Sequence, residues 1–245
     1  MRRLGAGILF GQWPGGMVPY ETDDVANWTV VTDAMRTISN AVPAIRFRRR
    51  VASDAHWVYV TSEGDGCSAP VGWQWRMAQH NLTLGEGCRV HRIALHELLH
   101  ILGLTHEMQR RDRDEWVTIN WENVQEDKQY NFETMWPLVT YGAGYDCLSL
   151  MQYADHDFAI NASLPTIVSK KCVLVTRPDN ASMSEGDVLF LKKYYADHDY
   201  RAWIDYGLVL LFVVSAMAWV FSYLGRRVGP RKSKPRGLSI HKYRP

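Results

Sequence analysis

Three histidines and one glutamate near the middle of the chain have the spacing of a metal site that could carry out hydrolysis. The segment HELLHILGLTHE begins at His96 and places His100 four residues later, so on a helix both imidazoles lie on one face, one turn apart. Neutral imidazole is a common zinc ligand, and Glu97 stands beside the first ligand, where its carboxylate could reach a water molecule. We therefore expect a zinc site with Glu97 as the general base.

The third ligand is predicted from a glycine. A helix continued past Gly103 would carry His106 away from the other two histidines, whereas glycine tolerates the left-handed turn that lets the chain double back. Three protein ligands leave a fourth position for water, which is typical of catalytic zinc. We expect one zinc ion per chain. The alternative, a surface helix with ordinary hydrogen-bonded histidines, gives no reason for Gly103 and His106 to stand at these offsets.

The residues after this motif resemble one family of zinc metallopeptidases. HEMQRRDRDEWVTIN, from His106, is similar to the astacin signature HExxRxDRD followed by V-x-I, and SLMQY, residues 149–153, resembles the astacin S-x-M-H-Y turn. The resemblance runs from about Ile8 to Tyr195 and includes WPGGMVPY, residues 13–20. It implies an α+β fold, namely a two-lobed metzincin catalytic domain built around a zinc-binding helix, and hydrolysis of peptide bonds in proteins.

The resemblance also implies roles for single residues. In astacins the residue matching Glu107 pairs with the freed N-terminal amine of the mature enzyme, Met151 would lie beneath the zinc, and Tyr153 would donate a hydrogen bond to the oxyanion. Glu97 would take a proton from zinc-activated water and deliver it to the leaving amine. Gln152 stands where the family has histidine, and because it changes no ligand we expect little effect.

Four cysteines suit two disulfides, and three pairings are open. The resemblance implies that Cys67 pairs with Cys88, which matches a family disulfide. Both partners of the family's second disulfide are absent. Cys147 and Cys172 lie outside the usual positions, and we expect them to pair and to brace the loop beyond the methionine turn. The alternative is two buried free thiols.

Two features concern substrate and activation. Lys170 and Lys171 lie near where some acid-preferring relatives place a basic residue, so they are candidates for a substrate pocket, and two solvated loop lysines are the alternative. Counting back from Trp13 as in astacins places the mature start near Leu4, directly after two arginines.

Periodicity predicts the elements that must position these residues. Apolar residues recur near helical spacing in residues 23–40, and residues 89–102 form a strong helix candidate. Ser184 could cap a last helix, residues 185–195. Short strands are expected at residues 45–47 and 57–60, and residues 112–123 contain an alternating strand or extended segment.

The C-terminal part predicts membrane attachment. Residues 206–225 carry no charge, and 20 helical residues span roughly 30 Å, the thickness of a bilayer core. Arg226 and Arg227 follow, so the positive-inside rule places a basic tail, residues 226–245, in the cytoplasm. We expect a catalytic domain at residues 4–200 outside the cell or in a lumen, and a single-pass helix. The alternative for the apolar segment is a buried core helix.

Charge and sequons bear on partners. The net charge is +2, but the tail holds eight of the 28 basic residues, so the remaining 20 stand against 26 acidic residues and the body carries −6. This balance argues against nucleic-acid binding. Four N-glycosylation sequons favour a secreted or lumenal body, and they begin at Asn27, Asn81, Asn161 and Asn180. The main alternative function is a catalytically silent, membrane-tethered binding ectodomain. Oligomeric state is left open.

Overall fold

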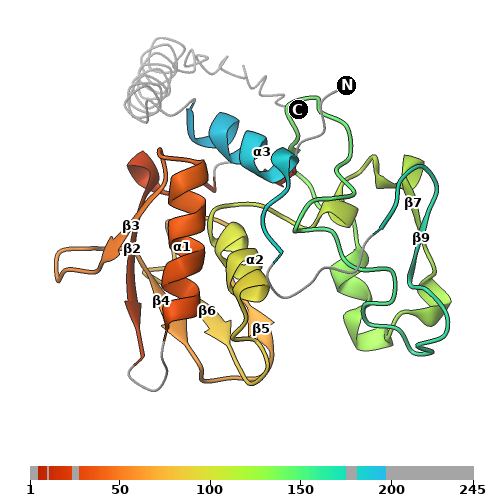
Figure 1. Cartoon of the computed structure of the whole chain (residues 1–245), viewed down its shortest axis with the longest axis horizontal. Coiled ribbons are helices and arrows are strands. Elements are labelled where there is room, and N and C mark those ends of the chain that lie inside the picture. Colours follow the sequence, from red (N-terminus) through yellow and green to blue (C-terminus); the bar gives the residue numbers. More distant parts are fainter. Residues whose placement is uncertain (1–4, 10, 24–27, 175–180, 197–245) are drawn as a thin grey trace, which may run out of the picture. The chain divides into compact units, whose positions relative to one another are not determined.

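The computed structural model describes residues 5–9, 11–23, 28–174 and 181–196 (Figure 1). All of them belong to one compact unit, residues 1–198. Within these ranges, no helix has the length and apolar character needed to cross a bilayer. The predicted span at residues 206–225 and the basic tail lie outside the described residues, as do the sequon residues Asn27 and Asn180.

The N-terminal lobe, residues 11–101, is built on a five-stranded sheet with strand order β3-β2-β4-β6-β5. The pairs are parallel except β5 against β6, which is antiparallel. Val58 and Val60 alternate toward the core and are fully buried. The strands are β2 (Met17–Thr22), β3 (Arg46–Arg49), β4 (Trp57–Thr61), β5 (Cys67–Ser68) and β6 (Gln79–Leu84).

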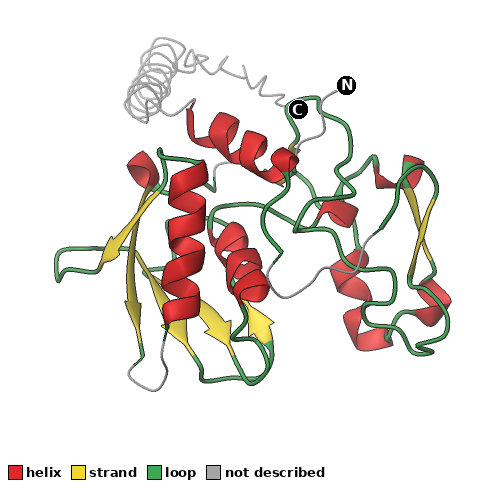
Figure 2. Ribbon diagram, in the orientation of Figure 1, coloured by secondary structure: helices red, strands yellow, loops and turns green. Residues whose placement is uncertain are grey.

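Two helices cover one face of this sheet (Figure 2). Helix α1 (Thr29–Ala41) buries Val31, Ala34, Met35 and Ile38, which recur at the spacing of one helical stripe. Helix α2 (His91–Ile101) lies deeper, because every residue from Ala94 to Ile101 except His96 is buried. A helix buried on nearly all sides is a rigid support for the side chains it carries.

The C-terminal lobe, residues 102–174, has little regular structure. Its strands are short: β7 (Val117–Ile119) pairs antiparallel with β9 (Ile167–Ser169), and β8 (Leu138–Val139) pairs with the N-terminal β1 (Gly7–Ile8). Short 3-10 helices connect them: η2 (Glu107–Gln109), η3 (Arg113–Glu115), η4 (Trp121–Asn123) and η5 (Glu126–Phe132). A further short 3-10 turn, η1 (Pro14–Gly16), precedes the sheet.

The lobe has a core of its own, formed around Met108, Phe132, Tyr145 and Ile167. After this lobe, helix α3 (Glu185–Ala196) packs Phe190, Leu191 and Tyr194 into the core of the N-terminal lobe. The chain thus returns to its first lobe and closes the unit.

The α+β fold class is confirmed, with helices and mixed sheet arranged in two lobes. Both disulfides are confirmed as well, Cys67–Cys88 with a Cα separation of 5.6 Å and Cys147–Cys172 with 6.2 Å. Strand β6 and the two-residue strands β1, β5 and β8 were not predicted, whereas WPGGMVPY, which resembles the opening strand of the astacin family, contains the first part of β2. The segment 112–123 is two 3-10 turns around the three-residue β7, because Val117 and Ile119 are its only buried apolar residues.

Candidate metal centre and active site

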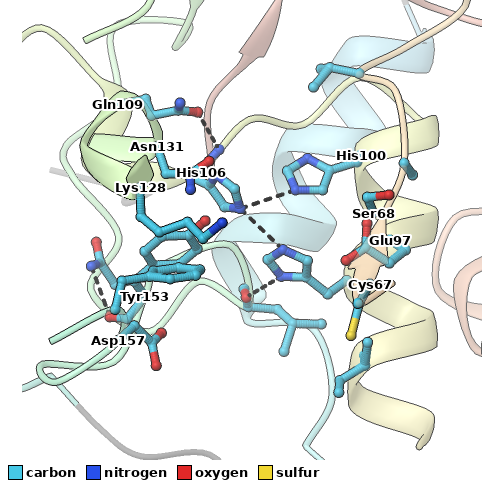
Figure 3. Close-up of a pocket in the computed structure, with 18 of the residues that line it drawn as sticks. Cys67, Ser68, Glu97, His100, His106, Gln109, Lys128, Asn131, Tyr153 and Asp157 are labelled. Carbon is cyan, nitrogen blue, oxygen red and sulfur yellow. Dashed lines mark hydrogen bonds between the residues drawn. The ribbon is translucent and has the colours of Figure 1, made fainter. Parts of the chain in front are cut away.

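Three imidazoles from two elements converge on one point. Helix α2 presents His96 and His100 one turn apart, and His106 approaches from the loop that follows the helix (Figure 3). The Nε2 atom of His106 lies 3.2 Å from Nε2 of His96 and 3.1 Å from Nε2 of His100. Two bonds of about 2.0–2.1 Å at a tetrahedral angle place ligand nitrogens about 3.3 Å apart, so the three atoms are spaced as zinc ligands are.

The hydrogen bonds of the outer ring nitrogens decide what these Nε2 atoms can do. Nδ1 of His96 lies 3.0 Å from the carbonyl oxygen of Leu150, and Nδ1 of His100 lies 2.9 Å from that of Leu104. A carbonyl only accepts, so both Nδ1 atoms carry protons and both Nε2 atoms are bare acceptors. His106 could donate to only one of them. A shared cation satisfies all three lone pairs, and burial lowers the pKa of His100 to about 4, which keeps that ring neutral for binding.

A left-handed glycine ends the metal helix. Gly103 has φ +100°, and its N–H donates to the carbonyl of His100 at 2.8 Å. A Cβ at this position would lie 2.9 Å from the ring of Tyr194, so both the dihedral angle and the packing require glycine. The turn reverses the chain after Leu102 and brings His106 back over the helix.

Glu97 lies on the same helix, next to the first histidine, and in Figure 3 it is on the opposite side of the imidazoles from Tyr153. It is only 5% exposed, and its Oε2 atom has no hydrogen-bond partner among the described residues. Burial raises the pKa of this carboxyl to about 8. A buried acceptor without a partner is costly, so its position at the floor of a cleft points to a ligand that it awaits.

The opposite wall is aromatic. The ring of Tyr153 lies 4.4 Å from that of His106, 5.5 Å from Phe132 and 5.4 Å from Phe158, measured between centroids. Met151 is buried two residues earlier, and its carbonyl accepts the N–H of Glu107 at 3.0 Å. Burial raises the pKa of Tyr153, so its hydroxyl keeps its proton and can donate a hydrogen bond.

A second buried carboxylate lies behind the metal ligands. Glu107 is fully buried, and its Oε1 atom accepts from Arg110 at 2.9 Å and from the N–H of Asp146 at 2.7 Å. Its Oε2 atom has no partner within the described part of the chain. Burial raises the pKa of Glu107 to about 8, although Arg110 and the N–H of Asp146 oppose this shift. The carboxyl therefore has one oxygen still available to a donor.

The metal centre opens into a cleft of about 1010 Å³ lined by both lobes. The N-terminal lobe contributes the β5 edge and helix α2, including Ser68 and Arg92. The C-terminal lobe contributes η5 and the segment after the methionine turn, including Lys128, Tyr130 and Asp157. Such a cleft has room for an extended polypeptide.

The two candidate pocket lysines are not among the described residues that line this cleft. Lys170 donates through Nζ to the carbonyl of Asp114 at 2.6 Å, and Lys171 lies 3.8 Å from the carboxylate of Glu115. The prediction that they form part of a substrate pocket therefore gains no support, and Lys128 is a lysine that does line the cleft.

Sequence reasoning missed two supporting side chains. Gln152 is buried and donates to the carbonyl of Tyr153 at 3.0 Å, while accepting from the hydroxyl of Tyr145. Gln109 accepts the N–H of His106 at 3.2 Å. Gln152 was expected to matter little because it is no ligand. Its contacts run through a residue seven positions away, and no local pattern in the sequence shows them.

Comparisons with known proteins agree with this geometry. The profile of the Astacin peptidase family matches residues 9–196. The chain is 31% identical over 201 residues to zinc metalloproteinase nas-8 of Steinernema carpocapsae, covering 80% of this chain and 47% of that protein. It is 33% identical over 191 residues to bone morphogenetic protein 1 of Xenopus laevis, covering 75% of this chain and 27% of that protein. The chain thus spans about a quarter to a half of the length of these curated relatives.

A solved structure gives the same result. High choriolytic enzyme 1, a hatching enzyme zinc-protease from Oryzias latipes, superposes with a TM-score of 0.68 at 29% sequence identity. The superposition covers 76% of this chain and 94% of that one.

Proposed function

Because this chain belongs to the astacin family of peptidases, we propose that it is a zinc-dependent endopeptidase that hydrolyses peptide bonds in proteins. The observation that carries this proposal is the set of three facing imidazole acceptors beside the buried carboxyl of Glu97, whose Oε2 atom has no hydrogen-bond partner among the described residues. A silent binding ectodomain has no need of that carboxyl, whose burial without a partner costs stability. The proposal therefore favours an active enzyme over the silent alternative.

The chemistry divides among three groups. His96, His100 and His106 would hold the zinc, which would supply a Lewis acid for the peptide carbonyl and for the attacking water. Glu97 accepts the proton of the attacking water and passes it to the leaving amine. Burial raises the pKa of this carboxyl toward the near-neutral range in which a side chain can both take and release a proton. Tyr153 donates a hydrogen bond to the oxygen on which negative charge develops.

The substrate would be an extended peptide. The β5 edge strand at the cleft is exposed and pairs with β6 on one side, so its other side offers backbone groups to a peptide strand. Lys128 and Tyr130 line the opposite wall. These groups support binding of a polypeptide rather than of a small molecule.

Activation is part of the proposal. The described chain begins at Gly5, whose N–H lies 3.4 Å from the carbonyl of Gly186, beside the buried Asp187. Cleavage before Leu4 would free an amine close to this buried acidic region, where the Oε2 atom of Glu107 has no partner among the residues that the structure describes. N-terminal sequencing of protein recovered from cells would find a start at or near Leu4, and a start far from it would refute this step.

Membrane attachment and glycosylation are further parts that rest on the sequence. We propose a single-pass anchor at residues 206–225 with the catalytic domain outside the cell or in a lumen. Two of the four sequons begin at described residues, Asn81 and Asn161, and both side chains are exposed, as glycosylation requires. Glycosidase treatment of protein from secretory cells would lower its apparent mass, and carbonate extraction would leave it in the membrane fraction.

The function is tested by incubating the purified body, residues 4 to about 201, with a peptide library. Mass spectrometry identifies the bonds that are cut. Cleavage should stop with chelator and return when zinc is added back. A correctly started protein that binds zinc and cuts no peptide in the library would contradict the proposal and favour a binding ectodomain.

A further inference from the structure

A buried side chain in the lining of the cleft, that of Gln152, binds the backbone of Tyr153. Gln152 is 3% exposed, and its Nε2 atom donates to the backbone carbonyl of Tyr153 at 3.0 Å. The Oε1 atom of the same amide accepts from the hydroxyl of Tyr145, which is fully buried. One amide therefore links a buried tyrosine to the backbone of the cleft tyrosine.

Tyr145 is itself held on both sides. Its ring stacks on Trp116 with centroids 5.9 Å apart and planes inclined by 12°, and the guanidinium of Arg110 lies 5.6 Å from its centroid. Arg110 is fixed in turn by its buried ion pair with Glu107. Burial also raises the pKa of Tyr145, so its hydroxyl remains a donor. The hydroxyl of Tyr145 is therefore a hydrogen-bond donor that is held in place beside Gln152.

Two kinds of contact act on Tyr153. Its neighbours His106, Phe132 and Phe158 contact it as tilted or edge-on rings, which are packing contacts rather than directed hydrogen bonds. Directed hydrogen bonds reach it through the backbone, where Gln152 binds its carbonyl. Hydrogen bonds restrict direction, whereas apolar contacts do so only weakly.

We infer that Gln152 and Tyr145 are positioning residues for Tyr153, which keep its hydroxyl aimed at the reacting carbonyl. This inference rests on the proposed function, because the role of Tyr153 does. It gives a role to the one place in the methionine turn where this chain departs from the astacin pattern. Tyr145 is fully buried outside the cleft lining and Gln152 is only 3% exposed, so we expect both to act on kcat through Tyr153.

A double-mutant cycle tests the coupling. Tyr145→Phe should lower kcat on the order of tenfold with KM unchanged, since the loss of one buried hydrogen bond corresponds to about one tenfold step. In the Tyr153→Phe background the same change should have no further effect, because there is no hydroxyl left to aim. If the two effects multiply, Tyr145 is merely structural and the inference is wrong.

Two controls separate positioning from general destabilisation. Tyr195→Phe removes another buried tyrosine hydroxyl, which bonds the carbonyl of Leu102 at 3.1 Å, and its effect on kcat should multiply with that of Tyr153→Phe. Gln152→Leu should lower kcat as Tyr145→Phe does, and Gln152→His, which restores a hydrogen-bonding side chain, should recover part of the loss. Failure of Gln152→His to exceed Gln152→Leu would count against the inference.

A readout that does not require activity decides the matter even if no substrate is cut. With ring-labelled tyrosine, the Tyr153 signal is assigned in the NMR spectrum by its loss in Tyr153→Phe. Tyr145→Phe and Gln152→Leu should shift and broaden this signal, whereas Tyr195→Phe should leave it in place. An inactive wild type would refute the proposed function alone, and an unchanged Tyr153 signal in both variants would refute the positioning role alone.

Discussion

The two lobes hold their share of the site by different means. In the N-terminal lobe a five-stranded backbone ladder and two packed helices fix His96, His100 and Glu97 on one buried helix. In the C-terminal lobe the described strands have two or three residues, and side chains take over the bracing. Asn123 shows this, since its amide donates to the carbonyls of Leu164 at 2.6 Å and Asn161 at 3.2 Å.

The two kinds of bracing suit the different roles of the lobes, one of which holds metal ligands and the base while the other shapes the substrate wall. Two metal ligands and the base need fixed relative positions, and a buried helix supplies these from local sequence alone. The substrate wall needs a loop shape that no repeating backbone pattern provides, so buried amides, an arginine and a disulfide shape it. Apart from the ligand His106 and the base Glu97, a change in the first lobe should therefore act through folding or metal binding, and a change in the second through the alignment of Tyr153.

The largest effect is expected from the ligands, because the metal is the one group that both lobes hold. His106→Ala, in the C-terminal lobe, should lose zinc as completely as His100→Ala on the helix, and both should be inactive. Metal content by mass spectrometry checks this. His80→Gln, which changes a buried histidine that is no ligand, should keep one zinc per chain. If His106→Ala kept one zinc per chain and still cleaved peptide, the N-terminal lobe alone would be sufficient for metal binding and catalysis.

The next effect is expected from the aromatic wall. Tyr153→Phe should keep its zinc and its KM but lose about 10²-fold in kcat, the typical cost of removing one oxyanion donor. Steady-state kinetics on one defined peptide gives both constants. If KM rises and kcat is unchanged, Tyr153 binds substrate rather than the transition state.

The two disulfides offer a matched comparison between lobes. They close loops of similar length, with sequence separations of 21 and 25 residues, so each should contribute about 3 kcal/mol to the unfolding free energy. Replacing both Cys147 and Cys172 with serine should also lower kcat, because the loop that this disulfide closes carries Met151 and Tyr153. Replacing both Cys67 and Cys88 with serine should lower the unfolding free energy by a similar amount but lower kcat less. If the two disulfide variants had the same unfolding free energy and lost kcat equally, the proposed difference between the lobes would be wrong.

The smallest effect concerns pH in the N-terminal lobe. Burial lowers the pKa of His80, whereas an unfolded histidine takes up a proton near pH 6.5. The unfolded state then binds more protons than the folded state, so the unfolding free energy should fall as pH drops below about 6.5. Urea unfolding at pH 7.5 and 5.5 should show a smaller drop for His80→Gln than for wild type. An identical pH dependence would mean that His80 titrates alike in both states.

Sequence alone predicted what local spacing determines. The helix at residues 91–101 and the turn at Gly103 follow from periodicity and from one conformational requirement, and the metal ligands follow from both. The β6 strand was missed because its first three residues are polar, although His80, Leu82 and Leu84 alternate toward the core. Gln152 was undervalued because its partner Tyr145 is recognisable only once the loop is folded.

The most direct test of the central claim is Glu97→Gln, which keeps the size and packing of the side chain and removes its ability to take a proton. The variant should fold, bind one zinc per chain as wild type does, and lose about 10²–10⁴-fold or more in kcat. Cleavage at the wild-type rate by the zinc-loaded variant would contradict the account, because the buried carboxyl would then not be the base.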